Sequence, residues 1–311
     1  MSHKTKLPPW MALLFLLVLS LLLVITLLQP SKQEHRVESP AEQLHDKPAK
    51  AELAMPEYEL DEPLLEATEQ AALPRLASGL ALILDDVGYD LPALQRILAL
   101  PAPVAIAVIP GAPYARESAI MAHENGQMVM LHLPMEPTSE KYRKKMTSYF
   151  LHEKMSRDEL RATFLRGLEK VPHVEGVNNH MGSYLTEQLD PMRWVMQICR
   201  DAGLFFVDSK TSNKSVAAQA AELMNVPWAS RQIFLDHDRQ PEAMLKAWQK
   251  AERCLEKGYR CVVIAHPYKE TLAFLEEQLG NQTQALLTPV KQLLRGGESL
   301  QQAKIKAEAL L

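Results

Sequence analysis

The chain has 311 residues and a mass of 35.0 kDa, with 47% hydrophobic and 23% charged residues, so it is long enough to bury one sizeable core. This composition excludes disordered and fibrous proteins. The net charge of -4 and the isoelectric point near 6.2 give no broad positive field for a phosphate backbone, which argues against a nucleic-acid-binding protein.

The N-terminal segment 1–29 contains a long stretch without charge. Residues 11–28 are uncharged, and as a helix they approach the roughly 30 Å of a bilayer core. Lys4 and Lys6 precede them, so we expect this end to stay in the cytoplasm. No small-residue cleavage site follows, which favours an uncleaved anchor over a cleaved signal peptide. We predict an inner-membrane anchor with the folded domain in the periplasm, or an exported domain if the segment is cleaved.

Residues 30–77 are rich in Glu, Ala, Pro and Gln and show little hydrophobic periodicity. Such a segment buries too little apolar surface to offset the entropy of ordering it, so we predict an acidic, proline-rich flexible linker. The folded domain is expected over residues 78–285, and residues 286–311 are expected to form a C-terminal helical extension.

Beyond the linker, short apolar runs alternate with segments of helical periodicity. Seven runs have the character of strands, at 80–84, 104–109, 128–131, 174–178, 204–207, 232–235 and 261–265. Helices are expected at 91–100, 114–125, 157–170, 191–202, 216–224, 241–257 and 270–279. The runs are continuously apolar, as in a sheet that is covered on both faces. We predict an α/β fold with a distorted seven-stranded β/α barrel, and an open doubly wound sheet is the alternative.

Six of these runs end in an acidic residue or a histidine. The residues are Asp85 and Asp86, His132, His180, Asp208, Asp236 and His266. In a parallel sheet with helical crossovers the carboxyl ends of the strands lie on one rim, so these side chains should converge. Carboxylates and imidazoles together are the ligands of divalent transition metals, which predicts a metal site at that rim.

Asp85 and Asp86 directly follow the first run. Because successive side chains of a strand point in opposite directions, we expect the two carboxylates to diverge, one toward a metal and the other toward a substrate as a base. The structural alternative is a turn followed by a helix cap.

Cys199, Cys254 and Cys261 form neither an even set nor a Cys-x-x-Cys motif. Their apolar or helical surroundings predict small buried side chains in preference to a disulfide framework.

Five motifs follow one another along this pattern, from its first run to its last. They are ALILDDVG at 81–88, LHLPME at 131–136, NNHMGS at 178–183, FVDSKT at 206–211 and IAHP at 264–267. Together they resemble the divergent polysaccharide deacetylase family, which is related to the NodB-type polysaccharide deacetylases. The resemblance covers roughly residues 78–280 and implies a distorted seven-stranded β/α barrel with a metal-dependent hydrolytic site.

The same resemblance implies roles for individual residues. Asp85 matches the general base of the deacetylases, Asp86 matches a metal ligand, and His266 matches the general acid that ends the last strand.

The metal ligands of the third strand depart from the family pattern. His132 falls where the deacetylases supply metal-binding histidines, but Glu136 stands where the second histidine of their His-x-x-x-His pair would be. His180 is the expected replacement. The implied cofactor is a divalent metal, with zinc favoured.

Five residues near these positions are candidates for contact with the substrate. They are Glu136, Asn178, Asn179, Asp208 and Ser209. Glu136 is also a candidate fourth ligand, and the two asparagines are equally suited to orienting ligands. Asp208 is suited to orienting His266, binding sugar hydroxyls or capping a helix.

Two further clusters have a structural interpretation. Asp236-His237-Asp238 resembles a metal site in isolation, but capping of the next helix by Asp238 is favoured. Lys141, Arg143, Lys144 and Lys145 are interpreted as a solvated loop, with a lid or a contact to an anionic glycan as the alternative.

The sequence therefore predicts metal-dependent hydrolysis of the N-acetyl amide of an envelope polysaccharide, with Asp85 and His266 as the acid-base pair. The alternative is a catalytically inactive glycan-binding or regulatory module on the same barrel, which the missing histidine pair favours. The expected partners are an N-acetylated glycan and, through residues 1–29, the membrane; no nucleic acid is expected.

Overall fold

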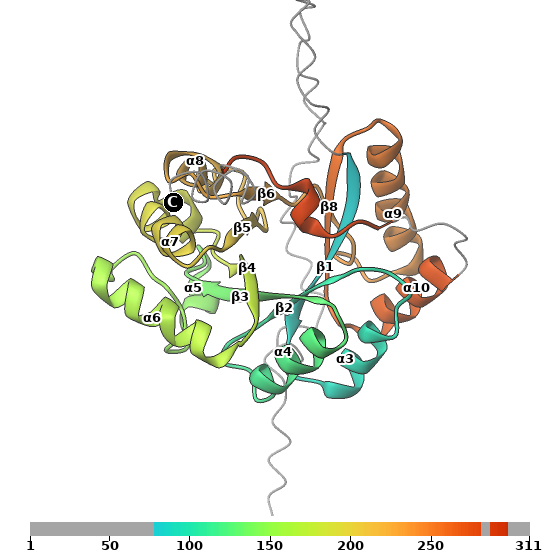
Figure 1. Ribbon diagram of the computed structural model, residues 1–311, viewed down its shortest axis with the longest axis horizontal. Coiled ribbons are helices and arrows are strands. Elements are labelled where there is room, and N and C mark those ends of the chain that lie inside the picture. Colours follow the sequence, from blue (N-terminus) through green and yellow to red (C-terminus); the bar gives the residue numbers. More distant parts are fainter. Residues whose placement is uncertain (1–77, 281–286, 298–311) are drawn as a thin grey trace, which may run out of the picture. The chain divides into compact units, whose positions relative to one another are not determined.

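The computed structural model describes residues 78–280 and 287–297 (Figure 1). The predicted anchor at 1–29 and linker at 30–77 lie outside the described residues, as do residues 298–311 of the predicted C-terminal extension. Within the described ranges, no helix is both long enough and apolar enough to cross a bilayer.

One sheet of eight parallel strands organises the described residues. Its hydrogen-bonded order is β6-β5-β4-β3-β2-β1-β8-β7. The strands are β1 (Gly79–Val87), β2 (Ala105–Val108), β3 (Met128–Met135), β4 (Val174–Met181), β5 (Phe205–Asp208), β6 (Trp228–Ser230), β7 (Ile233–Phe234) and β8 (Arg260–Ala265). The sheet is curled (Figure 1), but no ladder joins its edge strands β6 and β7 within the described chain. It is therefore an open half-barrel. The predicted α/β fold with parallel strands is confirmed, but the predicted count of seven strands is wrong.

The strand that the sequence pattern misses is β6. It pairs with β5 through Phe206–Trp228, Val207–Ala229 and Asp208–Ser230. Of the three residues in β6 only Ala229 is buried, so the strand has no apolar run. Its pairing partner, and not its own hydrophobicity, determines that it is a strand.

Helices connect the successive strands, except β6 and β7, and cover the outer face of the sheet (Figure 1). They are α3 (Leu91–Leu98), α4 (Ala115–Glu124), α5 (Glu140–Arg143), α6 (Arg157–Lys170), α7 (Leu189–Asp201), α8 (Ala217–Leu223), α9 (Pro241–Glu256) and α10 (Lys269–Gly280), with 3-10 helices η1 (Leu185–Glu187) and η2 (Val290–Leu293). Each of the seven predicted helical segments overlaps one of these α-helices.

Alternation along the strands separates two apolar layers. On β1, Leu80, Leu82 and Leu84 pack outward among the helices, whereas Ala81 and Ile83 belong to a smaller cluster on the inner face. The inner cluster also contains Met130 of β3, Val207 of β5, and Val262 and Ile264 of β8. Each strand therefore presents every second side chain to the concave side, as expected of a curled sheet.

The same alternation positions polar groups above the inner layer. Asp85 stands two residues after Ile83, His132 two after Met130, and His266 two after Ile264. These side chains therefore share the concave side of the sheet at its carboxyl ends.

The described C-terminal residues cover the opposite, amino end of the sheet. Bridges join Leu287 to Leu80 at the start of β1 and Arg295 to Trp228 at the start of β6. Between them, η2 contributes Val290 and Leu293 to the inner apolar cluster.

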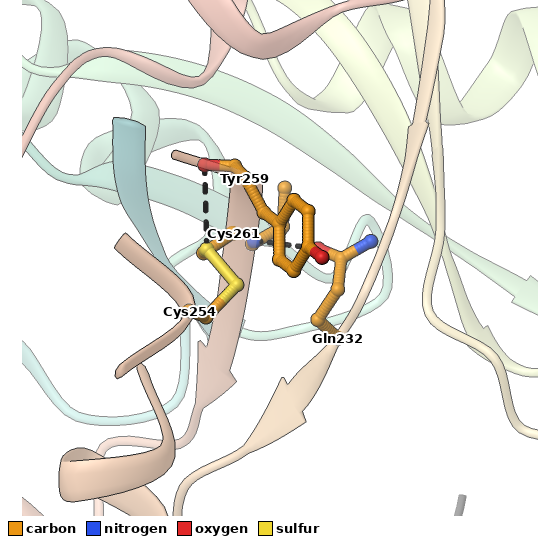
Figure 2. The surroundings of a disulfide bond; sticks show 5 residues. Gln232, Cys254, Tyr259 and Cys261 are labelled. Carbon is orange, nitrogen blue, oxygen red and sulfur yellow. Dashed lines mark hydrogen bonds between the residues drawn. A yellow bond between two sulfur atoms is a disulfide. The ribbon is translucent and has the colours of Figure 1, made fainter. Parts of the chain in front are cut away.

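A disulfide joins Cys254 near the end of α9 to Cys261 at the start of β8, as Figure 2 shows. The prediction that all three cysteines are unpaired is therefore wrong for this pair, while Cys199 is free and buried as expected. A tight turn through Gly258, which has a φ of 76°, returns the chain so that the two Cα atoms lie 6.2 Å apart. This separation suits a disulfide, and the sequence spacing of seven residues does not reveal it.

The disulfide should stabilise the fold modestly, because it closes only a short loop. We expect reductant to lower the free energy of unfolding in urea by about 2 kcal/mol. The double variant Cys254→Ala/Cys261→Ala is the control, since reductant should leave its unfolding midpoint unchanged. Unfolded protein should expose one titratable thiol before reduction and three after; three thiols before reduction would contradict the disulfide.

Candidate metal centre

Asp85 and Asp86 lie where β1 leaves its regular ladder with β2. The register shifts between Leu84 and Val87, and Asp86 has a φ of 57°. This irregularity turns the Asp86 carboxylate toward the concave side, to which alternation already directs Asp85. Asp86 Oδ1 lies 3.2 Å and Asp85 Oδ2 lies 3.7 Å from His132 Nε2, so the predicted divergence of the two carboxylates is wrong. Left-handed backbone at a non-glycine residue is costly and is concentrated at functional sites.

His132 and His180 bring two imidazoles to Asp86 from neighbouring strands. In the β3–β4 ladder, His180 is opposite Pro134, two positions beyond His132. His180 Nδ1 lies 2.9 Å from Asp86 Oδ1 and 3.2 Å from His132 Nε2. One ligand atom from each of the three residues thus falls within 4.8 Å of the others, the arrangement expected of a metal site.

Asn178 fixes the orientation of His132. This fully buried amide donates from Nδ2 to Asp85 Oδ1 at 2.7 Å, and its Oδ1 lies 2.9 Å from His132 Nδ1. Because an amide oxygen only accepts hydrogen bonds, His132 carries a proton on Nδ1. A neutral His132 therefore presents the lone pair of Nε2 to Asp86 and His180.

The three converging atoms suit a cation. Both imidazoles approach Asp86 Oδ1 at ion-pair distance, yet this buried oxygen accepts no hydrogen bond of good geometry. Without a proton or a metal between them, the lone pairs of two nitrogens and one oxygen would repel each other. Two imidazole nitrogens and a carboxylate oxygen are a common set of zinc ligands.

The pKa shifts of Asp86 and His132 also favour a bound cation at this centre. Burial alone would raise the pKa of Asp86, but His180 and His132 hold it well below its usual value. Burial alone would lower the pKa of His132, but Asp85 and Asp86 raise it. The negative potential that favours a proton on the imidazole would equally favour a divalent cation in its place.

His266 approaches Asp86 from β8, with Nε2 3.9 Å from Asp86 Oδ2. Asp236 contacts His266 through both carboxylate oxygens. Oδ1 lies 3.0 Å from His266 Nδ1, and Oδ2 accepts the His266 backbone N–H at 2.7 Å. Thr271 donates to the same Oδ2 at 2.9 Å. Burial would lower the pKa of His266, but Asp236 outweighs it and raises the pKa to about 9. His266 is therefore a cation at neutral pH in the metal-free protein.

Asp236 is the functional residue that the sequence pattern assigns wrongly. The predicted partner of His266, Asp208, instead accepts from the backbone N–H of Lys210 and the hydroxyl of Ser215, each at 2.8 Å. Asp236 directly follows the apolar run at 232–235, which contains β7, so its position is visible in the sequence. Its contact with His266 depends on the pairing of β7 with β8, which the sequence does not give.

The other predicted substrate contacts are mostly buried. Asn178, Asn179, Asp208 and Ser209 are 0 to 6% exposed. Asn179 Oδ1 accepts the Ser209 N–H at 2.9 Å, and its Nδ2 donates to Met181 O at 2.7 Å. These residues support the ligands and the turns around them and expose little surface to a glycan, so we infer positioning roles for them.

Glu136 lies apart from the three-residue cluster. Its Oε2 accepts the backbone N–H of Glu153 at 2.9 Å, and its Oε1 lies 3.3 Å from Arg143 Nε. The carboxylate thus anchors the segment after β3, and Glu136 is not among the residues that converge with His132. Its predicted contact with substrate stays a prediction.

Aromatic rings flank both histidines that face solvent. The centroid of Phe150 lies 6.1 Å from that of His180, and those of Phe234 and Tyr268 lie 5.3 and 5.5 Å from that of His266. These rings pack against both imidazoles, whose side chains stay partly exposed.

The cluster should bind one divalent cation. After treatment with a chelator, we expect calorimetric titration with Zn²⁺ to give one tight site. Removal of one of three ligands in His180→Gln should weaken binding by about 100-fold or more. The matched control is His123→Gln, an exposed histidine in the last turn of α4 that does not belong to the cluster. Equal affinities for the two variants would disprove the assignment of His180.

The pair His266–Asp236 should make stability depend on pH in chelator-treated protein. Because the folded pKa of about 9 exceeds the ordinary 6.5, the stabilisation is complete below pH 6.5 and is lost as pH rises through 9. The shift corresponds to about 3 kcal/mol. Urea unfolding across this range should show the loss in the native protein and in Asp238→Asn, but a much smaller one in Asp236→Asn. Parallel profiles for all three would refute the coupling.

Comparisons with known proteins identify the family of the chain. A family model described as divergent polysaccharide deacetylase matches residues 82–294. The chain is 36% identical over 209 residues to the uncharacterized protein YibQ of Escherichia coli, covering 67% of this chain and 64% of that relative, and therefore spans less than two thirds of its length. It is 34% identical over 204 residues to an uncharacterized protein of Haemophilus influenzae, covering 66% and 72%.

A solved structure supports the fold independently. An uncharacterized protein from Agrobacterium tumefaciens C58 superposes with a TM-score of 0.64 at 17% identity, over 71% of this chain and 91% of that chain. At this identity the likeness concerns the fold alone. The family model covers more than half of the chain, as the five motifs predict, and this protein belongs to the divergent polysaccharide deacetylase family.

Proposed function

We propose that the protein hydrolyses the N-acetyl amide of an envelope polysaccharide, using a divalent metal held by Asp86, His132 and His180. The observation that carries the proposal is the convergence of these three ligand atoms beside Asp85 and His266. Membership of the deacetylase family supports the substrate class. The products are acetate and a free amine on the sugar.

A bound metal would polarise the acetamide carbonyl and lower the pKa of a nearby water. The two histidines and Asp86 would hold it, and Asn178 keeps His132 in the tautomer that offers Nε2. Zn²⁺ suits this set of two nitrogens and one oxygen, which leaves positions for water and substrate.

Asp85 is suited to the role of base. It is 2% exposed, and burial raises its pKa, so its carboxylate accepts a proton more readily than one in water. Asn178 holds Oδ1, and Oδ2 faces the metal ligands. In this role Asp85 takes a proton from the water that attacks the acetamide carbon.

His266 is suited to the role of acid. Its Nδ1 proton is held by Asp236, so the proton on Nε2 is directed toward the centre. Transfer of that proton to the amide nitrogen lets the carbon–nitrogen bond break and releases the amine.

We further propose that the domain works outside the cytoplasm. The disulfide between Cys254 and Cys261 is typical of oxidising compartments. The uncharged stretch at 11–28 is long enough for a membrane anchor. A periplasmic location would give the site access to envelope glycans.

A second candidate is a glycan-binding or regulatory module without turnover. The observation that favours it is Glu136, which replaces a family histidine and is engaged by Arg143 and Glu153. In this case the ligand cluster would serve structure or binding only.

Release of acetate from a chitin oligosaccharide distinguishes the two candidates. We expect the full chain with Zn²⁺ to release acetate, and Asp85→Asn to lower kcat by about 100-fold or more, the usual range for loss of a general base. Metal affinity should be kept in this variant. The control is Asp190→Asn at an exposed position on α7. If the native chain binds the oligosaccharide without releasing acetate, the module is the correct function.

A further inference from the structure

The segment between β3 and α6 carries a concentration of positive charge. We define the basic loop as residues 140–154. It contains five cationic side chains against two carboxylates, in a chain whose net charge is -4. The cations are Lys141, Arg143, Lys144, Lys145 and Lys154, and the carboxylates are Glu140 and Glu153.

The ends of the basic loop are fixed to the carboxyl end of β3. Leu151 forms a bridge with Met135, and its N–H donates to Pro134 O at 2.9 Å. The Glu136 N–H donates back to Leu151 O at 2.8 Å. The loop therefore projects from the rim that holds His132.

The basic loop also contacts the metal centre directly. Phe150, which is 7% exposed, packs its ring edgewise on His180. Arg143 donates from Nε to Pro137 O at 2.9 Å and lies over the ring of Tyr184 at 4.9 Å. One side of the loop is thus built into the wall of the site.

The lysines on the other side remain exposed. Lys141, Lys144 and Lys145 all face solvent. Lys144 pairs with Glu140 at 3.1 Å, but both side chains are more than 70% exposed, and such pairs contribute little. Glu153 accepts from the Tyr184 hydroxyl at 3.2 Å, so its carboxylate is directed toward the Tyr184 ring. The loop therefore retains a net positive surface.

We propose that the basic loop binds negatively charged groups on the same glycan chain whose acetamide enters the metal centre. This inference rests on the proposed function and specifies its substrate as an anionic N-acetylated polysaccharide. Cations at the rim would attract such a polymer and raise its local concentration beside the centre. A neutral glycan would gain no affinity from these cations.

A membrane surface is the other possible anionic partner of such a loop. The contact of Phe150 with His180 favours the glycan, because it places the loop beside the reacting group. A loop that serves only to bind lipid headgroups has no need of a contact with a ligand histidine.

The test compares two glycans and two charge-reversed variants of the full chain in neutral detergent. The probes are a hyaluronan oligosaccharide, which alternates N-acetylated and carboxylated sugars, and a neutral chitin oligosaccharide of equal length. The loop variant is Lys141→Glu/Lys144→Glu/Lys145→Glu. The control variant, Lys246→Glu/Lys250→Glu/Lys257→Glu, makes the same change of charge at exposed positions on and just after α9, across the sheet from α5 (Figure 1).

We expect the native chain to bind hyaluronan about tenfold or more tighter than chitin at low salt, and the difference to shrink as salt is added. The loop variant should lose this preference, and the control variant should keep it within about twofold. Equal binding of the two glycans, no binding of either, or equal losses in both variants would overturn the proposal. A loop variant that keeps the glycan preference and, in a separate assay, loses affinity only for vesicles of phosphatidylglycerol would also overturn it. Because binding is the readout, these results are independent of acetate release from chitin, which tests the proposed function.

Discussion

Alternation of side chains along a curled parallel sheet is the constraint on which the centre depends. Every inner-facing apolar residue at the carboxyl end of β1, β3 and β8 is followed, two positions on, by a polar side chain on the same side. The apolar layer below these polar side chains determines where they lie and in which direction they point. Asp86 lies among these side chains only because the β1–β2 register shifts after Leu84 and the backbone of Asp86 is left-handed. Regular geometry thus supplies the frame, and one local irregularity completes the ligand set.

The buried polar groups of the site form one connected network. Asn178 contacts Asp85 with its amide nitrogen and His132 with its amide oxygen, so the proposed base and a proposed ligand are oriented by the same side chain. Asp236 holds both the ring and the backbone of His266. Such networks are rigid when every member is satisfied, and Asp86 Oδ1 in this site is a buried oxygen without a hydrogen bond.

Much of this arrangement is visible in the sequence, because apolar runs and the residues that end them are local signals. Asp85, His132, His180 and His266 are found in this way. What the sequence does not reveal depends on neighbours: β6 is recognisable only beside β5, Asp236 only once β7 lies beside β8, and the disulfide only once the turn at Gly258 is formed. The orientation of Asp86 depends on a dihedral angle that no residue pattern specifies.

The position of His180 on β4 has a consequence for the chain after β3. With the second imidazole supplied from another strand, residue 136 no longer needs to coordinate anything, and its carboxylate instead secures Arg143 and the backbone of Glu153. Residues 140–154, which follow β3, therefore contain none of the three proposed ligands. The sequence of that segment can consequently change while Asp86, His132 and His180 keep their places at the ends of the strands.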